Sequence, residues 1–211
     1  RSSPKRVSIQ WRPQFTLPIE EGLDSKLHET VYTVNYQDVL ILVLNSTDFL
    51  EKQTEYIQKK LSNSDAKWKI VTCHHSVFSP AQGRDFEYAR KNWKPLFDKY
   101  GVDLVLNGHD HTYARGHVPV KNTDNNKSSD FNTLYITSVS GPKQYKIGLE
   151  QLKEYGRDGY IINKTGEQTQ FFQVISINNE TLTYKAYTAL GDEYDTAIIK
   201  KDFSTGKKTL E

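Results

Sequence analysis

The sequence contains no methionine, only one cysteine and no long hydrophobic run. A single cysteine, Cys73, excludes a framework of intramolecular disulfide bonds. A membrane-spanning helix needs about 20 consecutive apolar residues, so we expect no membrane among the partners. Because the chain starts at Arg1 and has no methionine, it reads as an excerpt, and we expect further segments upstream.

An excess of charge of one sign is also missing. The 28 Lys and Arg residues nearly balance the 26 Asp and Glu residues, which leaves a net charge of +2. This balance gives no large field to attract a polyanion, so we expect no nucleic acid as a partner. The chain has 211 residues, enough for one full-sized domain of the usual range of about 50 to 250 residues.

Strand and helix patterns alternate through the first half of the chain. Residues 39–44 are apolar on both faces, which favours a strand inside a covered sheet. Asp48, with Glu51 three residues later, predicts a capping box at the start of a helix. In chain order, the patterns predict a strand at 28–36, a strand at 39–44, a helix at 49–61, a strand at 68–73, a helix at 93–100 and a strand at 102–106. This alternation indicates βαβ units and an α/β fold.

The two ends of the chain differ in character. Residues 1–27 are polar and contain three prolines, which predicts an irregular lead-in. A polar loop at 121–130 separates the α/β part from segments of alternating β-branched and aromatic residues, which predict strands at 133–139, 169–177, 181–188 and 196–200. The chain is thus predicted to form part of one domain, with the lead-in at 1–27, an α/β half at 28–118 and a β-rich remainder at 119–211.

Four of the six histidines follow two of the predicted buried strands. His74 and His75 come directly after one strand, and His109 and His111 follow the other. The carboxyl ends of strands are where α/β sheets place their ligands. On extended backbone, side chains at i and i+2 point the same way, so His109 and His111 can converge only if their segment is not helical.

Three imidazoles at neighbouring strand ends suit a borderline metal such as Zn, Mn or Fe. The alternative is that these histidines are surface or hydrogen-bonded residues, because an H-x-H pair arises easily by chance. Both pairs lie at strand ends that should be adjacent. That placement favours the metal site.

Two segments resemble the calcineurin-like metallophosphoesterase family. One is KIVTCHHSVF at 69–78, and the other is NGHDHTY at 107–113. The longer stretch PLFDKYGVDLVLNGHDHTYAR at 95–115 is similar to the purple acid phosphatases within that superfamily. The resemblance is strong over about residues 11–115 and looser at 134–142.

The resemblance implies a layered α/β/β/α sandwich, of which this chain would be roughly the second half with a β-rich C-terminal tail. It also implies hydrolysis of phosphate monoesters at a dinuclear centre of Fe, Zn or Mn ions, divalent or mixed-valence. His74 and His109 would bind one metal and His111 the other. A swap of roles between His74 and His75 stays open, because Ser76 stands where the family has proline.

Three early motifs of the family, D-x-H, G-D-x-x and G-N-H, which precede the histidine segments, are missing from this chain. In the family they supply a bridging aspartate, an asparagine ligand and a catalytic histidine, so we assign no catalytic residue here. We expect the whole protein to be a phosphatase, and this chain alone to be inactive with one metal or none. A sheet edge left open by the missing half should favour self-association. The resemblance further implies a periplasmic or secreted location.

Arg84 and Asp85 lie in the loop after the first histidine pair. Arginine can donate two hydrogen bonds to phosphate oxygens, so we predict that both residues bind substrate. The alternative is an ordinary loop ion pair. For the whole protein, a phosphodiesterase of the same superfamily and a non-catalytic module with vestigial histidines remain as other functions.

Overall fold

The structure, a computed structural model, describes residues 9–120 and 130–211. Its strands are β1 (Tyr32–Tyr36), β2 (Val39–Leu44), β3 (Trp68–Cys73), β4 (Leu104–Asn107), β5 (Tyr113–Pro119), β6 (Phe131–Thr137), β7 (Ile161–Gly166), β8 (Phe171–Asn178), β9 (Thr181–Thr188), β10 (Glu193–Lys201) and β11 (Lys208–Leu210). Its helices are α1 (Trp11–Gln14), α2 (Leu50–Ser62), α3 (Lys94–Lys99) and α4 (Leu149–Arg157), with a 3₁₀ turn at Ser25–Leu27 and a π-helical turn at Ala89–Trp93. Nearly all of the predicted polar loop at 121–130 lies outside the described residues.

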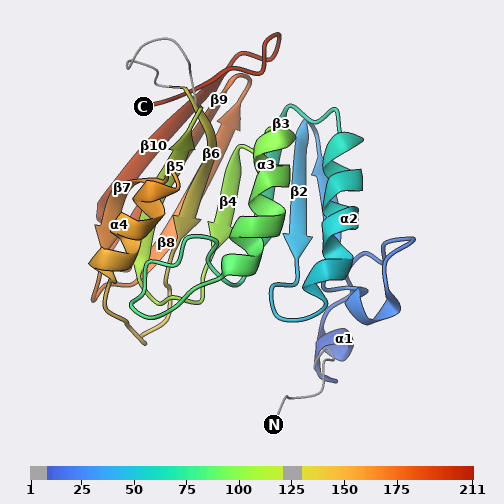
Figure 1. Cartoon of the computed structure of the whole chain (residues 1–211), viewed down its shortest axis with the longest axis horizontal. Coiled ribbons are helices and arrows are strands. Elements are labelled where there is room, and N and C mark those ends of the chain that lie inside the picture. The colour runs from blue at the N-terminus through green and yellow to red at the C-terminus, as the bar shows by residue number, and fades with distance from the viewer. Residues whose placement is uncertain (1–8, 121–129) are drawn as a thin grey trace.

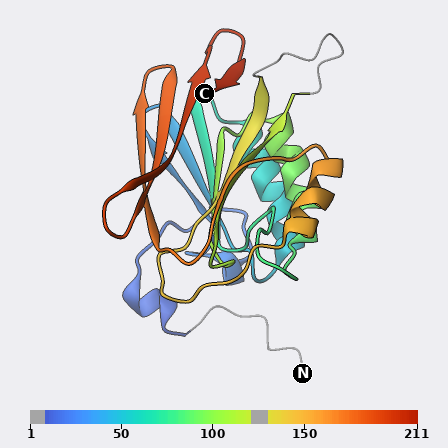
Figure 2. The same ribbon diagram turned by 90° about the vertical axis from the view of Figure 1, so that its left-hand side faces the viewer.

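The strands form two sheets that pack against each other (Figure 2). The larger sheet has seven strands in the order β1-β2-β3-β4-β6-β5-β7, and the smaller has four in the order β11-β10-β9-β8. Helices α2, α3 and α4 cover the other face of the larger sheet (Figure 1). The α/β fold class is confirmed, and the described residues supply three layers of the sandwich: helices, sheet and sheet.

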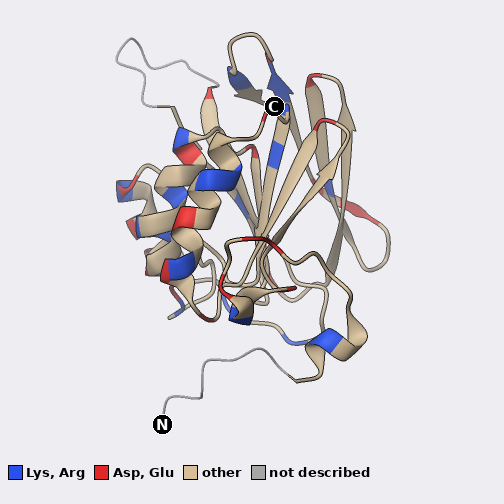
Figure 3. Ribbon diagram, turned by 90° about the vertical axis from the view of Figure 1, so that its right-hand side faces the viewer, with Lys and Arg blue, Asp and Glu red and all other residues tan. Residues whose placement is uncertain are grey.

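Each layer boundary has its own apolar core. Leu40, Leu42 and Leu44 of β2 face the helices and are buried there with Ile57 of α2. Residues of β6, β9 and β10 fill the second core between the sheets. Lys, Arg, Asp and Glu are interspersed along the outer helices, so this exposed layer carries both signs of charge (Figure 3). The alternation of apolar residues along each element therefore accounts for the layering.

The predicted helix at 49–61 is confirmed as α2, but its predicted start is wrong. Phe49 occupies the N-cap position with a φ of 54°, and no side chain caps the helix. The buried Gln53 amide instead donates to the carbonyl oxygens of Asn45 at 2.7 Å and Asp48 at 3.1 Å. These bonds organise the turn before the helix, so the Asp48 carboxylate is not needed as a cap.

The lead-in is more ordered than predicted over the residues that the structure describes. It contains α1 and the 3₁₀ turn, and Trp11 Nε1 donates to the Glu29 carbonyl oxygen at 2.9 Å. Glu20 accepts a bond of 2.8 Å from the backbone of Thr33 and pairs with Lys60 at 2.5 Å. Among the described residues, no helix combines the length and the apolar character that a membrane crossing requires.

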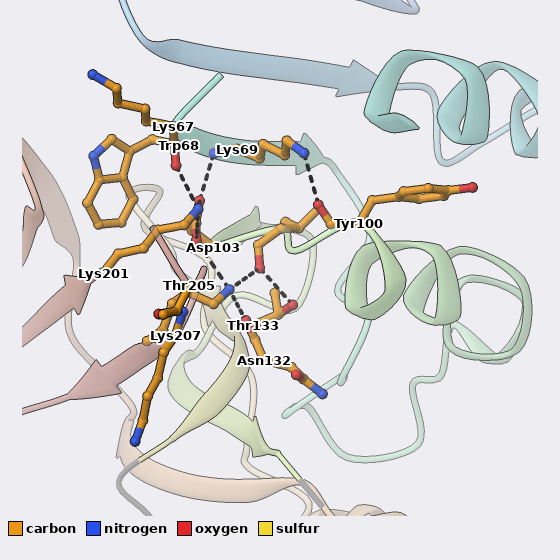
Figure 4. Close-up of polar contacts among 12 residues, drawn as sticks. Lys67, Trp68, Lys69, Tyr100, Asp103, Asn132, Thr133, Lys201, Thr205 and Lys207 are labelled. Carbon is orange, nitrogen blue, oxygen red and sulfur yellow. Dashed lines mark hydrogen bonds and ion pairs between the residues drawn. The ribbon is translucent and has the colours of Figure 1, made fainter. Parts of the chain in front are cut away.

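A buried carboxylate joins the two sheets at the amino ends of β3 and β4. Asp103 accepts a bond of 2.8 Å from the backbone of Lys69 and bonds of 2.9 and 3.0 Å from Lys201 Nζ (Figure 4). Lys208 Nζ of β11 lies 3.2 Å from the same carboxylate. Because Lys201 belongs to β10, this cluster fastens the smaller sheet to the larger one.

The smaller sheet covers only part of the larger one. A groove of about 560 Å³ lies between β8 and the uncovered face of β2, β3 and β4. Val39 and Ile41 line one side, and Ile175 and Ile177 of β8 line the other. Strands β1 and β8 are edge strands of their sheets. The groove and the two edges therefore leave an apolar surface in the described part of the chain.

Candidate metal centre

The four histidines gather where two neighbouring parallel strands end. Thr72 of β3 lies opposite Leu106 of β4 in register. Just beyond, the Gly108 backbone N–H donates to the His74 carbonyl oxygen at 2.9 Å, which keeps the two segments side by side. The predicted adjacency of the two histidine-bearing strand ends is confirmed.

The loop after β4 turns through a left-handed backbone. The φ angles are 69° at His109 and 51° at His111, a region that residues other than glycine seldom occupy. The prediction that this segment is not helical is confirmed, but the extended backbone that we assumed is wrong. Asp110 between them is fully buried while both imidazoles are partly exposed, so its carboxyl points into the protein. Burial raises the pKa of Asp110 to about 6.

His74 and His109 fit a single metal ion. His74 Nε2 lies 3.1 Å from His109 Nδ1. Two nitrogen ligands of one tetrahedral metal, each at about 2.0 to 2.1 Å, lie about 3.3 Å apart. Both nitrogens can offer a lone pair to one ion in the His109 tautomer that carries its proton on Nε2. Without an ion, the same distance is a hydrogen bond between the imidazoles.

His111 is oriented by its backbone surroundings. Its Nδ1 lies 3.0 Å from the Lys143 carbonyl oxygen and donates to it, which leaves the Nε2 lone pair free. Metal-binding histidines are commonly oriented by such a bond. Burial first, and then the proximity of the other imidazoles, lowers the pKa of both His74 and His109. Within the two described ranges, however, no three His, Cys, Asp or Glu side chains are grouped closely enough to hold one ion.

His75 lies beside the same cluster but has other partners. Its ring centroid is 4.0 Å from that of His109. Ser46, two residues after β2, contacts His75 Nδ1 through its hydroxyl at 2.9 Å and accepts a 2.9 Å bond from the His75 backbone. The structure thus turns His74 toward the Nδ1 of His109, and turns His75 toward Ser46.

Burial and positive neighbours favour the neutral form of these imidazoles. The pKa of His109 is lowered to about 4, first by burial and then by the charges of His75 and Arg84. Burial and neighbouring positive charge also lower the pKa values of His74 and His75. A neutral imidazole is the form that coordinates a metal.

The two residues predicted to bind substrate point in different directions. The Arg84 guanidinium donates to His109 Nε2 and, at 3.1 Å, to the Tyr145 hydroxyl. The Asp85 carboxylate instead accepts a bond of 3.0 Å from Arg90, in the π-helical turn. Arg84 therefore lies at the histidines, whereas Asp85 is engaged with its own loop.

Three residues beside the histidines were not predicted from the sequence: Ser46, Lys143 and Tyr145. Ser46 could have been found from the sequence, because it follows the carboxyl end of the predicted strand at 39–44, just as the histidine pairs follow the ends of their strands. Lys143 and Tyr145 lie in an irregular segment between β6 and α4. No motif marks that segment.

Comparisons with known proteins agree with this architecture. A family described as calcineurin-like phosphoesterase matches residues 8–113, half of the chain. An uncharacterized protein of Mycobacterium tuberculosis is 40% identical over 73 residues, which are 31% of this chain and 14% of that protein. Purple acid phosphatase 3 of Arabidopsis thaliana is 32% identical over 106 residues, which are 50% of this chain and 26% of the relative. The purple acid phosphatase PPD1 of yellow lupin (Lupinus luteus) overlays with a TM-score of 0.67 and 20% identity, covering 90% of this chain and 35% of that structure.

The extent of these matches decides what they show. The matched parts span 14% and 26% of the two curated relatives, so the relatives are much longer than this chain. At 20% identity, the lupin structure shows the fold alone. The family match includes all four histidines of the candidate metal centre. The chain belongs to the calcineurin-like phosphoesterase family, whose enzymes hydrolyse phosphate esters, and it is related to the purple acid phosphatases.

Proposed function

We propose that this chain supplies part of a dinuclear metal centre that hydrolyses phosphate monoesters in the whole protein. The approach of His74 Nε2 to His109 Nδ1 at 3.1 Å supports this most directly. His74 and His109 would hold one metal ion, and His111 the other through Nε2. Imidazole suits Fe, Zn and Mn. In this proposal, residues 1–211 are the C-terminal part of one metallophosphoesterase domain, with the divisions predicted from the sequence.

The bound ions would supply a nucleophilic hydroxide and stabilise the developing charge. The side chains of this chain would bind and orient the ester. Arg84 lies against His109, so a phosphoryl oxygen held beside that histidine is within reach of its guanidinium. Asp85 would act on the substrate only indirectly, because its bonds to Arg90 hold the loop that carries Arg84.

We further propose that the chain alone is inactive and binds one metal ion or none. A two-metal site needs a ligand that bridges the ions, and three imidazoles offer none. The remaining ligands would come from other parts of the whole protein.

Metal content and hydrolysis of p-nitrophenyl phosphate would test this proposal. Both would be measured on the chain and on the whole protein, as wild type and as His109→Ala. We expect two metals and activity only in the whole protein, with at least about a 100-fold loss on substitution. The matched control is His117→Ala, since His117 lies on β5 and bonds to Asn163 at 2.8 Å, apart from the cluster. An intact protein without metal and without hydrolysis would contradict the proposal.

A non-catalytic module is the second candidate, and one contact favours it. The permanently charged Arg84 guanidinium contacts His109, and a fixed cation beside a ligand opposes the binding of a metal cation. Absence of metal from the intact protein would support this candidate. A phosphodiester substrate is the nearest catalytic alternative, and bis-p-nitrophenyl phosphate in the same assay would reveal it.

We also propose that the whole protein has a periplasmic or secreted location, as its relationship to the purple acid phosphatases implies.

We propose as well that the chain self-associates through its open sheet edges. Val34 and Tyr36 on edge strand β1 are 40% and 67% exposed. Light scattering should show a dimer or larger species, and Val34→Lys should shift it toward the monomer. Ile19→Lys, outside the strands, serves as the control. A monomeric wild-type mass would refute self-association.

A further inference from the structure

The segment between β6 and α4 connects the two loops of the candidate metal centre. The Tyr145 backbone N–H donates to the His111 carbonyl oxygen at 3.1 Å. At the next residue, the Lys146 carbonyl oxygen accepts a 3.0 Å bond from the N–H of Gln82, which lies two residues before Arg84. The segment is therefore fixed on one side by the histidine loop and on the other by the arginine loop.

Two cationic side chains converge on the Tyr145 phenol in this segment. Arg84 donates to the Tyr145 hydroxyl at 3.1 Å, and its guanidinium carbon lies 4.6 Å from the centroid of the ring. Lys143 Nζ lies 5.1 Å from the same centroid. The Tyr145 ring in turn lies 4.8 Å from the His111 ring. The phenol thus brings an arginine and a lysine together beside a histidine of the candidate centre.

These two cations have no carboxylate partner among the described residues. Other cations of the same region do, since Arg90 pairs with Asp85 and Lys153 pairs with Glu150. Asp110 is affected by the charge of Arg84, but its buried carboxyl forms no ion pair with it in the described structure. Unpaired cations that are held together beside the histidine cluster create a local positive field, which attracts an anion.

We propose that Arg84, Lys143 and Tyr145 form an oxyanion-binding subsite for the phosphoryl group of the ester. This inference rests on the proposed function, and it adds two residues and a binding role to it. Arginine has five N–H donors and lysine has three, with no acceptor in either. The contacts above use few of those donors, so several remain free for phosphate oxygens that face away from the histidines.

Tyr145 acts in this subsite as a positioning residue. Its hydroxyl accepts the bond from Arg84 and its ring packs against both Arg84 and His111. The Gln151 side chain of α4 additionally donates to the Arg84 carbonyl oxygen, so the loop backbone is held independently of Tyr145. Loss of the hydroxyl should therefore release the guanidinium without displacing the loop.

Titration of the metal-free chain with inorganic phosphate tests this subsite. The 211-residue chain would be treated with a chelator and titrated by calorimetry at low ionic strength, where charge is screened least. We expect Tyr145→Phe to raise the Kd for phosphate about 3- to 10-fold, the range for one lost hydrogen bond of ordinary strength, because Tyr145 acts only through the position of Arg84. Lys143→Gln should raise it by about 3- to 5-fold.

Matched controls separate position from charge and from folding. Lys146→Gln removes the same charge from the same segment, and Tyr36→Phe removes an exposed hydroxyl elsewhere. Both should leave the Kd within about twofold of wild type. The NMR signal of the Arg84 Nε–H should shift in Tyr145→Phe and stay unchanged in Tyr36→Phe. If Tyr145→Phe fails to fold, as judged by its thermal melting, Lys143→Gln against Lys146→Gln decides the question.

The inference is overturned if the wild-type chain binds no phosphate, or if the subsite variants bind it as tightly as the controls do. Zinc titration of the whole protein, as wild type and as His109→Ala, tests the proposed function separately. Loss of metal binding there, with unchanged phosphate binding in Tyr145→Phe, would retain the metal centre and remove the subsite. Weakened phosphate binding in Tyr145→Phe, together with no zinc binding by the wild-type whole protein, would retain the subsite and remove the metal centre.

Discussion

The Tyr113 hydroxyl donates a 2.7 Å hydrogen bond to the Asp195 carboxylate, which joins the two sheets. Tyr113 begins β5, two residues after His111, and Asp195 belongs to β10 of the smaller sheet. Arg115 donates two further bonds of 2.7 and 2.9 Å to the same carboxylate. The smaller sheet therefore fixes the strand that leads out of the histidine loop.

Replacement of Asp195 should destabilise the fold strongly. Asp195→Ala leaves the Arg115 guanidinium buried without its partner, since its side chain is only 12% exposed. Removal of one partner from a buried ion pair costs about 3 to 5 kcal/mol of unfolding free energy. Chemical denaturation would measure the loss. Glu150→Ala is the control, because its pair with Lys153 is exposed and should contribute less than about 1 kcal/mol. A loss below 1 kcal/mol for Asp195→Ala would contradict the expectation.

The Asp195 contribution should depend on pH in a defined direction. Burial alone would raise the pKa of Asp195, but hydrogen bonds from Arg115 and Tyr113 lower it below its usual value. A carboxyl whose pKa is lower in the folded state stabilises the fold above its unfolded pKa of about 3.9, and this stability is lost as pH falls through the folded pKa.

The stability difference between wild type and Asp195→Ala should thus be constant from about pH 7 to about pH 5 and shrink below about pH 4. Urea denaturation of both proteins across this range would measure it. A difference that stays constant or grows on acidification would show that Asp195 is not held as the carboxylate.

The interior strands could be predicted from local patterns. They are covered on both faces, so their residues form apolar runs that are visible in the sequence without knowledge of the neighbouring elements. Strands β2, β3 and β4 belong to this class. Strand β5 was not predicted, since its Gly and Pro are depleted in strands and its sequence has no apolar run. Its Arg115 is satisfied by Asp195, 80 residues later in the chain. Such a distant partner cannot be inferred from local sequence.

The candidate site also has features that the sequence predicted and features that it could not predict. The adjacency of the histidine pairs followed from strand order, which is a general property of α/β sheets. The left-handed turns at His109 and His111 could not be predicted, because those residues seldom adopt them. The bond between Arg84 and Tyr145 spans 61 residues and has no motif at its far end.

Two glycine substitutions should have opposite effects on stability. A Cβ at Gly116 of β5 would lie 2.6 Å from the Ile161 carbonyl oxygen of β7 and would also clash with the Tyr160 ring. Gly116→Ala should therefore lower the unfolding free energy by about 1 to 3 kcal/mol. At Gly156 of α4, a Cβ meets nothing within 4 Å, so Gly156→Ala should raise the unfolding free energy by about 0.5 to 1 kcal/mol. Thermal melting of both variants would test the signs, and a stable Gly116→Ala would mean that β5 and β7 lie farther apart.

The roles of His74 and His75 can be separated by metal affinity. His74 presents Nε2 to His109, while His75 is held by the Ser46 hydroxyl through Nδ1. If His74 is the ligand, His74→Ala should lower zinc affinity in the whole protein by more than about 100-fold, and His75→Ala by less than about 10-fold. Competition with a chromophoric chelator would measure both.

Ser46→Ala adds an independent control. If His74 is the ligand, loss of the Ser46 hydroxyl should leave zinc affinity nearly unchanged, because that hydroxyl orients only His75. If His75 is the ligand, Ser46→Ala should weaken zinc binding by about 10- to 100-fold, the usual effect of removing a group that orients a metal-binding histidine. A large loss in both His75→Ala and Ser46→Ala would therefore assign the ligand to His75.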